Sequence, residues 1–224
     1  MNFIIRLIFI LGINLALSNN LYARSAPWVG VDLKGMTCQG EIMNYGPFDY
    51  RNAENRRTKL PIVEHYHFTP EVQKLIKGKS GYLVGDLAYT LRAFPNHYKA
   101  LTSLTYYQVL HQIDIAEKIK RPVQPAVECY FQRAAHFVPD DAVVQMLYAI
   151  YLKKIKRYDL AEKHYQKAIQ IAPDNMKLRY MYGLFLVKHK KYALANEQAK
   201  IVYSNNYPKQ KLKKKLIAAG IWKE

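Results

Sequence analysis

Apolar residues in the second half of the chain recur at alternating spacings of four and three positions. Ala161, Tyr165 and Ala168 follow this pattern. The equivalent positions are Val127, Phe131 and Ala134 upstream, and Ala195, Ala199 and Val202 downstream. These spacings place side chains on one face of an α-helix, because a helix completes a turn every ~3.6 residues. The pattern predicts three helices, each with one buried face.

Three prolines follow these segments at a nearly constant period. Pro139, Pro173 and Pro208 are separated by 34 and then 35 residues. A period of about 34 residues is typical of helix-turn-helix units that stack side by side. The sequences PDD at 139–141 and PDN at 173–175 each supply a helix stop and a residue that can cap the next helix. The pattern therefore predicts a series of helical hairpins.

These features resemble the tetratricopeptide repeat family. The resemblance rests on Ala161, Tyr165, Ala168 and Pro173 in the second helix of one unit. Matching positions in the preceding helices are Tyr148, Ala149 and Leu152, and then Tyr182, Gly183 and Leu186. The resemblance implies that small residues let paired helices approach closely, while aromatic residues fill the space between neighbouring pairs. We therefore expect Ala149, Ala161, Gly183 and Ala195 to lie at helix contacts.

The resemblance covers about half of the chain and departs from the family pattern in places. It runs from Asn96 to Tyr207, with an expanded turn at 113–126 in a degenerate first unit. Gln145 and Arg179 stand where the family usually has tryptophan. Lys156 and Lys190 replace its turn glycine. The implied fold is mainly α, a short helical-hairpin solenoid, with three hairpins over 96–208.

The segments on either side of the hairpins are expected to cap the solenoid. A stacked array leaves an apolar face at each end, and this face must be covered. We expect the irregular region 24–95 to cover the first hairpin. In the tail 209–224 we expect a helix, Lys209–Ala219, that turns Leu212, Leu216 and Ile217 inward and its lysines to water.

Turn and cap signals divide the N-terminal region. Residues 24–57 have no helical period, and 59–81 is expected to begin extended and to become helical after Thr69, a natural N-cap. Gly78 should end that helix. Asp86 is expected to cap a short helix and Asn96 a longer one, His97–Gln112.

The first 23 residues have the pattern of an export signal. Arg6 precedes an apolar run, Leu7–Leu17, and Ala23 stands at a suitable cleavage site. The run is shorter than the ~20 residues that span a bilayer, which makes an uncleaved anchor the less favoured alternative. We expect a periplasmic protein of a bacterium.

The two cysteines, Cys38 and Cys129, are consistent with an oxidising compartment. An even number of cysteines allows one disulfide there, although two buried free thiols remain an alternative. No CxxC pair occurs in the sequence, which argues against a thiol oxidoreductase and against a zinc ribbon.

The formal net charge of +17 indicates an anionic partner. Export would remove nucleic acid from consideration, leaving acidic proteins, anionic membrane surfaces or cell-envelope polymers. We expect a non-enzymatic scaffold or adaptor that binds an acidic or extended peptide and uses no cofactor. General binding to anionic envelope polymer or lipid is the alternative.

The predicted binding site is the concave face, which the family resemblance assigns to the first helix of each unit. The residues expected to contact the partner are Met146, Ile150, Lys153, Lys154, Lys177, Tyr180, Leu184 and Lys188. Apolar side chains would supply contact area, and the lysines would attract carboxylates. Tyr180 and Lys154 are the leading single candidates.

A second polar cluster precedes the repeats. His65 and His67 would share one face of a strand, as a pair of metal ligands could, and Glu64 or Asp86 could act in acid–base chemistry. No nucleophile motif accompanies them. We favour a structural interpretation, in which Arg51 or Arg92 pairs with carboxylates and holds the irregular region against the repeats.

Overall fold

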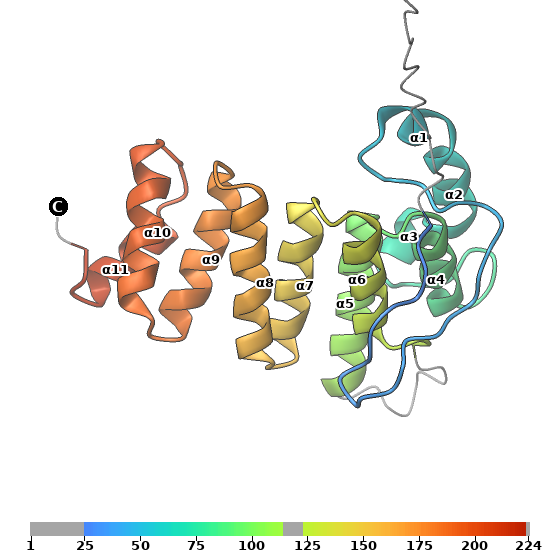
Figure 1. Ribbon diagram of the computed structural model, residues 1–224, viewed down its shortest axis with the longest axis horizontal. Helices are drawn as coiled ribbons and strands as arrows, with labels where there is room; N and C mark the ends of the chain where they lie inside the picture. Colours follow the sequence, from blue (N-terminus) through green and yellow to red (C-terminus); the bar gives the residue numbers. More distant parts are fainter. Residues whose placement is uncertain (1–24, 114–122, 223–224) are drawn as a thin grey trace, which may run out of the picture.

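The computed structural model of this protein describes residues 25–113 and 123–222. Within these two ranges the regular secondary structure is helical (Figure 1). The predicted export signal lies outside the described residues, as does 114–122, which makes up most of the predicted expanded turn. In the described ranges, no helix is both long and apolar enough to cross a membrane.

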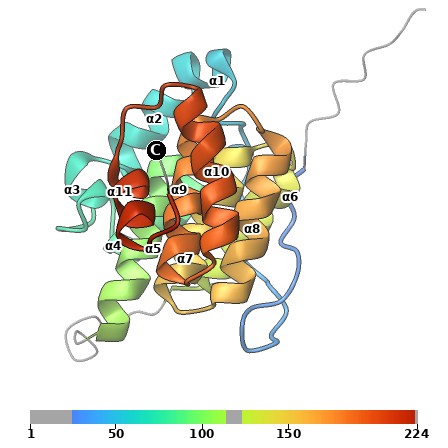
Figure 2. The same cartoon turned by 90° about the vertical axis from the view of Figure 1, so that its left-hand side faces the viewer.

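The predicted solenoid of helical hairpins is confirmed. Its helices are α5 (Tyr98–Ile113), α6 (Val127–Phe137), α7 (Ala142–Lys154), α8 (Tyr158–Ile171), α9 (Met176–Lys188), α10 (Tyr192–Ser204) and α11 (Lys211–Ala218). They form a row along the long axis of the molecule in Figure 1. Seen along that row in Figure 2, α6, α8 and α10 lie on one side, and α5, α7, α9 and α11 lie on the other.

The predicted inner positions form the core of the solenoid. All nine residues of the four-and-three pattern in α6, α8 and α10 are at most 1% exposed. Tyr165 of α8 contacts Tyr182 and Phe185 of α9, with ring centroids 5.7 and 5.1 Å away. Aromatic side chains thus fill the space between neighbouring hairpins, as predicted.

Gly183 lies at a helix contact, as predicted, and it also faces the capping helix. A Cβ atom at this position would lie 2.6 Å from Cδ2 of Leu212 in the capping helix α11. Leu212 and Leu216 are fully buried, which confirms that they face inward. Ile217 is 46% exposed, so its predicted inward orientation is wrong. It follows Leu216 directly and therefore points about 100° away around the helix.

Two helices end in the same turn, although neither has a glycine there. The N–H of Lys156 donates to Lys153 and that of Arg157 to Leu152 at the end of α7. The same pair of bonds follows α9, and Lys156 and Lys190 have φ angles of 63° and 59°. This Schellman geometry usually places glycine at the left-handed position, because a Cβ atom crowds the following carbonyl.

Replacing either lysine with glycine should stabilise the protein. We expect Lys156→Gly and Lys190→Gly each to raise the free energy of unfolding by about 0.5–1 kcal/mol, because the left-handed strain outweighs the added flexibility of the unfolded chain. Urea unfolding followed by circular dichroism measures the change. Lys156→Ala is the matched control, which removes the amine but keeps the strain. Equal effects of the glycine and alanine variants would contradict the explanation.

The N-terminal region is more helical than predicted. It contains α1 (Ala53–Thr58), α2 (Leu60–His67), α3 (Pro70–Gln73) and α4 (Leu83–Ala93). The segment predicted to be extended forms α2, whose Leu60 and Val63 pack on Phe94 and Ala93. Its proline, Pro61, lies in the first turn, where the missing N–H costs nothing. Tertiary burial therefore outweighs the local preference.

Several predicted caps act in other ways. Thr69 occupies the N-cap position of α3, but its side chain makes no capping bond, and the helix ends at Gln73 rather than near Gly78. Asp86 lies inside α4 and accepts hydrogen bonds from the backbone N–H groups of Lys79 and Ser80. The side chain that caps α5 is His97 rather than Asn96: its Nδ1 accepts from the backbone N–H of Ala100, three residues further on, at 3.1 Å.

The N-terminal strap, residues 26–41, crosses the outer face of α6. A disulfide between Cys38 and Cys129 joins the two, with Cα atoms 5.5 Å apart, which confirms the predicted pairing. Arg133 of α6 is 6% exposed and donates to the backbone oxygens of Ala26 in the strap and Leu91 in α4, at 2.7 and 2.8 Å. These bonds join the strap and α4 to the first hairpin.

Candidate functional site

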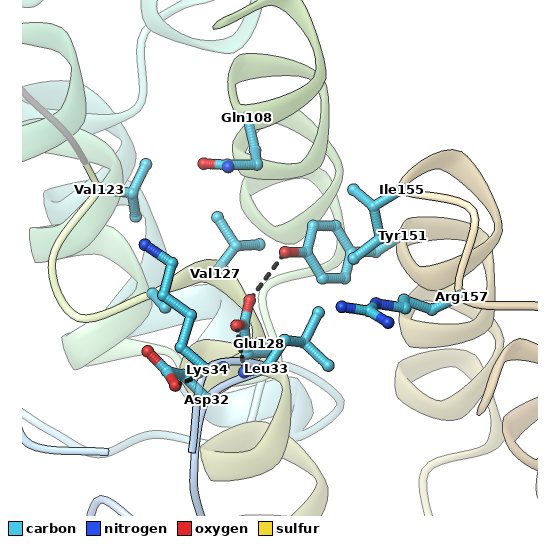
Figure 3. Close-up of a pocket in the computed structure, with 11 residues that line it drawn as sticks. Asp32, Leu33, Lys34, Gln108, Val123, Val127, Glu128, Tyr151, Ile155 and Arg157 are labelled. Atoms are coloured by element: carbon cyan, nitrogen blue, oxygen red, sulfur yellow. Dashed lines mark hydrogen bonds between the residues drawn. The ribbon is translucent and has the colours of Figure 1, made fainter. Parts of the chain in front are cut away.

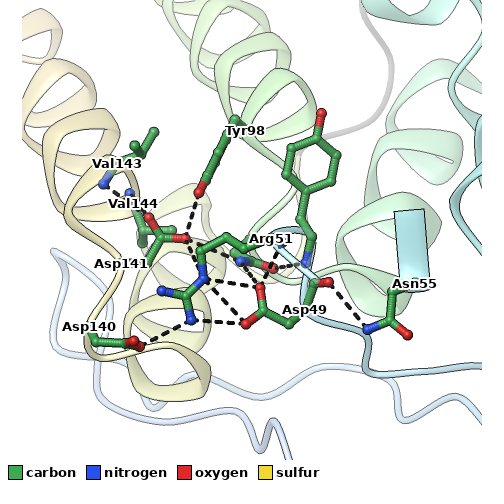
Figure 4. Close-up of polar contacts among 10 residues, drawn as sticks. Asp49, Arg51, Asn55, Tyr98, Asp140, Asp141, Val143 and Val144 are labelled. Atoms are coloured by element: carbon green, nitrogen blue, oxygen red, sulfur yellow. Dashed lines mark hydrogen bonds and ion pairs between the residues drawn. The ribbon is translucent and has the colours of Figure 1, made fainter. Parts of the chain in front are cut away.

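A polar cluster joins the N-terminal region to the start of α7 (Figure 4). Arg51 donates to Asp49 at 2.9 Å and to Asp140 at 3.1 Å, and it lies 3.7 Å from Asp141. Asp141 is 2% exposed and also accepts from the Tyr98 hydroxyl at 2.9 Å. The structural interpretation of Arg51 is therefore confirmed. Arg92 makes a similar bond, at 3.0 Å from Glu41 of the strap.

The histidines of this region are involved in packing. His65 and His67 lie on helix α2 rather than on a strand, so they do not share a face, and that prediction is wrong. His67 is 2.8 Å from Asp86. His97 is fully buried; its Nδ1 accepts from Ala100, which leaves Nε2–H to donate to Glu64 at 3.1 Å. Burial lowers the pKa of His97, although Glu64 opposes the shift.

The described residues contain no group of three or more side chains placed to hold a metal ion. Glu64 and Asp86, named as candidates for acid–base chemistry, both bond to histidines or to backbone amides that belong to the packing of α2, α4 and α5. Hydrogen bonds to carboxylates at such places order loops and helix starts. The cluster thus stabilises the junction between the N-terminal region and the repeats.

A pocket of about 480 Å³ lies where the strap meets α6, α7 and the end of α5 (Figure 3). In it the buried Glu128 accepts from the backbone N–H of Leu33 at 2.8 Å and from the Tyr151 hydroxyl at 2.7 Å. Burial, with the nearby Glu128 carboxylate, raises the pKa of Tyr151. One carboxylate oxygen of Glu128 thus holds the strap, and the other bonds to α7. Glu128 was not predicted as a functional residue, and its position beside Cys129 is the one sign in the sequence that it contacts the strap.

A second pocket, of about 640 Å³, lies between the end of α7, the last turns of α9, and α11. We call it the lysine pocket. Its basic lining residues are Lys153, Lys188, Lys211 and Lys215. Its apolar lining residues are Leu184, Val187, Tyr192, Ala218 and Ala219. No aspartate or glutamate of the described ranges lines it, and the four lysines form no ion pairs there.

The positive charges in the lysine pocket repel one another. Burial, together with the nearby charges of Lys154 and Lys188, lowers the pKa of Lys153. An anion placed among these amines would reduce the repulsion and would favour their protonated forms. The pocket is therefore suited to an anionic ligand that also offers apolar contact.

The structure brings together some of the predicted site residues and separates others. Lys153, Leu184 and Lys188 line one pocket. Lys154 extends instead toward α5, with its Nζ 4.4 Å from the centre of the Tyr106 ring. Lys177 is exposed at the start of α9, outside the lysine pocket, and Ile150 is half-buried.

Two predicted contact residues are buried in the core. Met146 is 6% exposed and Tyr180 is 7% exposed, so their prediction as accessible residues of a concave face is wrong. Tyr180 packs against Tyr207, with ring centroids 5.1 Å apart, because the chain turns back over α9 after α10. Lys211 and Lys215 were missed as pocket residues. Their signal was the basic face of the capping helix, which was assigned to water.

No family model matches the sequence, and no curated protein matches it significantly. The function is therefore inferred from the geometry of the pockets.

Proposed function

We propose that this protein is a non-enzymatic interaction module that binds an acidic, extended peptide segment in the lysine pocket. The observation that carries the proposal is the convergence of four lysines from α7, α9 and α11 around an apolar floor, with no acidic residue of the described ranges in the lining. A carboxylate-bearing peptide offers both the charge and the side-chain contact that such a lining recognises.

The lysine pocket differs from ordinary solvated surface. On α8 and α10 basic and acidic side chains are interspersed, and Glu162 of α8 pairs with Lys191, just before α10. A surface lysine with a carboxylate beside it attracts no particular ligand, because the neighbouring carboxylate already neutralises part of its charge. The four pocket lysines have no such partner within 25–113 and 123–222, which favours an external anion.

The proposal includes a tetratricopeptide-type solenoid that works outside the cytoplasm. The helical hairpins and their period support the first part. The Cys38–Cys129 disulfide supports the second, because disulfides persist in oxidising compartments such as the bacterial periplasm. The role that fits both is that of a scaffold or adaptor in the cell envelope.

Charge reversal in the pocket tests the binding site. The triple variant Lys188→Glu, Lys211→Glu and Lys215→Glu should bind a fluorescein-labelled peptide of glutamate and leucine residues at least about tenfold more weakly than the unmodified protein. The matched control is Lys163→Glu, Lys167→Glu and Lys200→Glu, which changes the net charge equally at exposed positions of α8 and α10. Fluorescence anisotropy measures both, with circular dichroism as a check of folding.

The same variants distinguish peptide binding in the lysine pocket from the alternative function. If both triple variants lose affinity equally, and anionic vesicles show the same loss with steep salt dependence, the positive charge acts as a whole. That result would replace peptide recognition by general binding to anionic lipid or envelope polymer. Retained peptide binding by the pocket variant would exclude the lysine pocket as the site.

A further inference from the structure

A third pocket lies beside α5, whose Tyr106 is contacted by Lys154 of the last turn of α7. It has a volume of about 490 Å³ and is lined by α5 and the segment that follows α3. We call it the α5 pocket. Its aliphatic and aromatic lining residues are Leu75, Tyr98, Tyr106 and Leu110, and Lys74 and Lys99 are its charged residues. Tyr106 and Leu110 are each 45% exposed and lie one helical turn apart on the same face of α5.

Exposed apolar side chains gathered in one pocket differ from singly scattered ones. An exposed leucine or tyrosine by itself is ordinary, but a contiguous apolar hollow is typical of a binding surface. Like the lysine pocket, the α5 pocket has no aspartate or glutamate in the lining that the structure describes. The hollow is therefore suited to an apolar side chain from a ligand that is acidic elsewhere.

Two consecutive lysines of α7 connect the α5 pocket to the lysine pocket. Lys153 lines the lysine pocket, whereas Lys154 lies over the Tyr106 ring of the α5 pocket, with 4.4 Å between its Nζ and the ring centroid. Ile150 lies one turn before both lysines and is half-buried. Consecutive residues of α7 thus reach both pockets.

We propose that the two pockets form one groove for a peptide that carries a bulky apolar residue three or four positions from an acidic residue. The acidic residue binds the lysine pocket and the apolar residue binds the α5 pocket. This spacing lets an extended chain, which advances about 3.3 Å per residue, cross one helix, which with its side chains is about 10 Å wide. This inference rests on the proposed function and adds the sequence pattern of the ligand.

Lys154 has a defined place in this arrangement. Its ammonium group lies over the Tyr106 ring, an aromatic face that stabilises the cation, and its neighbour Lys153 lines the lysine pocket. A peptide that crosses α7 would bring its backbone carbonyl groups past this amine. Lys154 is therefore the residue that contacts the ligand between its two side-chain anchors.

Three peptides test the pattern. The first has leucine followed by three serines and two glutamates. The second has serine in place of the leucine, and the third has the leucine directly beside the glutamates. We expect the first to bind at least about tenfold more tightly than either of the others, because only it can bury the leucine while its carboxylates reach the lysines. Fluorescence anisotropy at fixed ionic strength gives the three dissociation constants.

The double variant Tyr106→Ala and Leu110→Ser locates the apolar anchor. It should reduce the preference for leucine to less than about twofold, while its affinity for the serine peptide stays that of the unmodified protein. The matched control is Ile62→Ser and Tyr66→Ala, which removes two similarly exposed apolar residues on α2. The control should keep the full preference.

The outcomes distinguish this inference from the proposed function. Equal binding of all three acidic peptides would overturn the inference and would leave the lysine pocket as an anion site. A leucine preference that persists in the Tyr106 and Leu110 variant would overturn it as well, since the apolar anchor would then lie elsewhere. Absence of binding by every acidic peptide would overturn both the proposed function and this inference.

Discussion

Removal of the Cys38–Cys129 disulfide is expected to lower the free energy of unfolding by about 4 kcal/mol. The bond closes a loop of 91 residues. In the chain-entropy description, opening a loop of about this size gives the unfolded state that much more conformational freedom. The folded state loses little else directly, because Glu128 and Arg133 still hold the strap by hydrogen bonds. Urea unfolding of the Cys38→Ser and Cys129→Ser double variant measures the change.

Reduction of the unmodified protein provides the control. With a dithiol reductant its unfolding midpoint should fall to that of the double variant, because both lack the bond. The double variant itself should not respond to the reductant. A loss of less than about 1 kcal/mol would show that the strap adds little to the cooperative unit and that its contacts form and break independently of the solenoid.

Asp141→Ala is expected to destabilise the protein by about 4 kcal/mol. The buried carboxylate of Asp141 caps α7 by accepting from Val143 and Val144, and it accepts from Tyr98 and Asn96 on α5 and the preceding turn (Figure 4). The alanine variant loses the cap, removes the acceptor of the Tyr98 hydroxyl and of the buried Val144 N–H, and removes a charge that balances Arg51. Each of these losses costs about 1–3 kcal/mol, and they overlap.

The next repeat supplies a matched comparison. Asn175 occupies the same position before α9 and accepts from Leu178 alone, at 3.3 Å. It is exposed, so Asn175→Ala should cost only about 1 kcal/mol. Asp141→Asn should fall between the two, since it keeps the capping oxygen but not the charge. Thermal and urea unfolding of the three variants give the order. Similar losses for Asp141→Ala and Asn175→Ala would contradict the role of Asp141 as a junction residue.

The repeats could be predicted because their signals are local. Small and aromatic residues at four-and-three spacings define the buried face of each helix, and Asp141 and Asn175 mark where α7 and α9 begin. These signals act over a few residues, so they hold before the helices meet. Stacking of the hairpins then decides only which helices become neighbours.

The N-terminal region could be predicted less well for the same reason. Its helices α1, α2 and α3 are only 6, 8 and 4 residues long, too short for a period to appear. Isolated helices of this length are unstable in water, so contacts with the rest of the protein hold them. Leu60 and Val63 become helical because Ala93 and Phe94 cover them.

The candidate site shows most clearly which features the sequence predicts and which depend on tertiary packing. The sequence placed Lys153, Leu184 and Lys188 near one another, because equivalent positions of repeated helices meet on the same side of a stack. It could not show that Tyr180 would be covered by the returning chain, or that Lys211 and Lys215 would complete the pocket. These depend on the angle at which α11 packs.

The sequence by itself determined the helices of the repeats, their pairing into hairpins, the need for a cap at each end and the two cysteines available for a bond, because each of these depends on residue type and spacing along the chain. Only the tertiary structure decided which lysines share a pocket, which aromatic side chains remain exposed, and how the strap and the capping helix seal the ends. Those features depend on residues far apart in sequence, whose positions follow from how the close-packed side chains fit together.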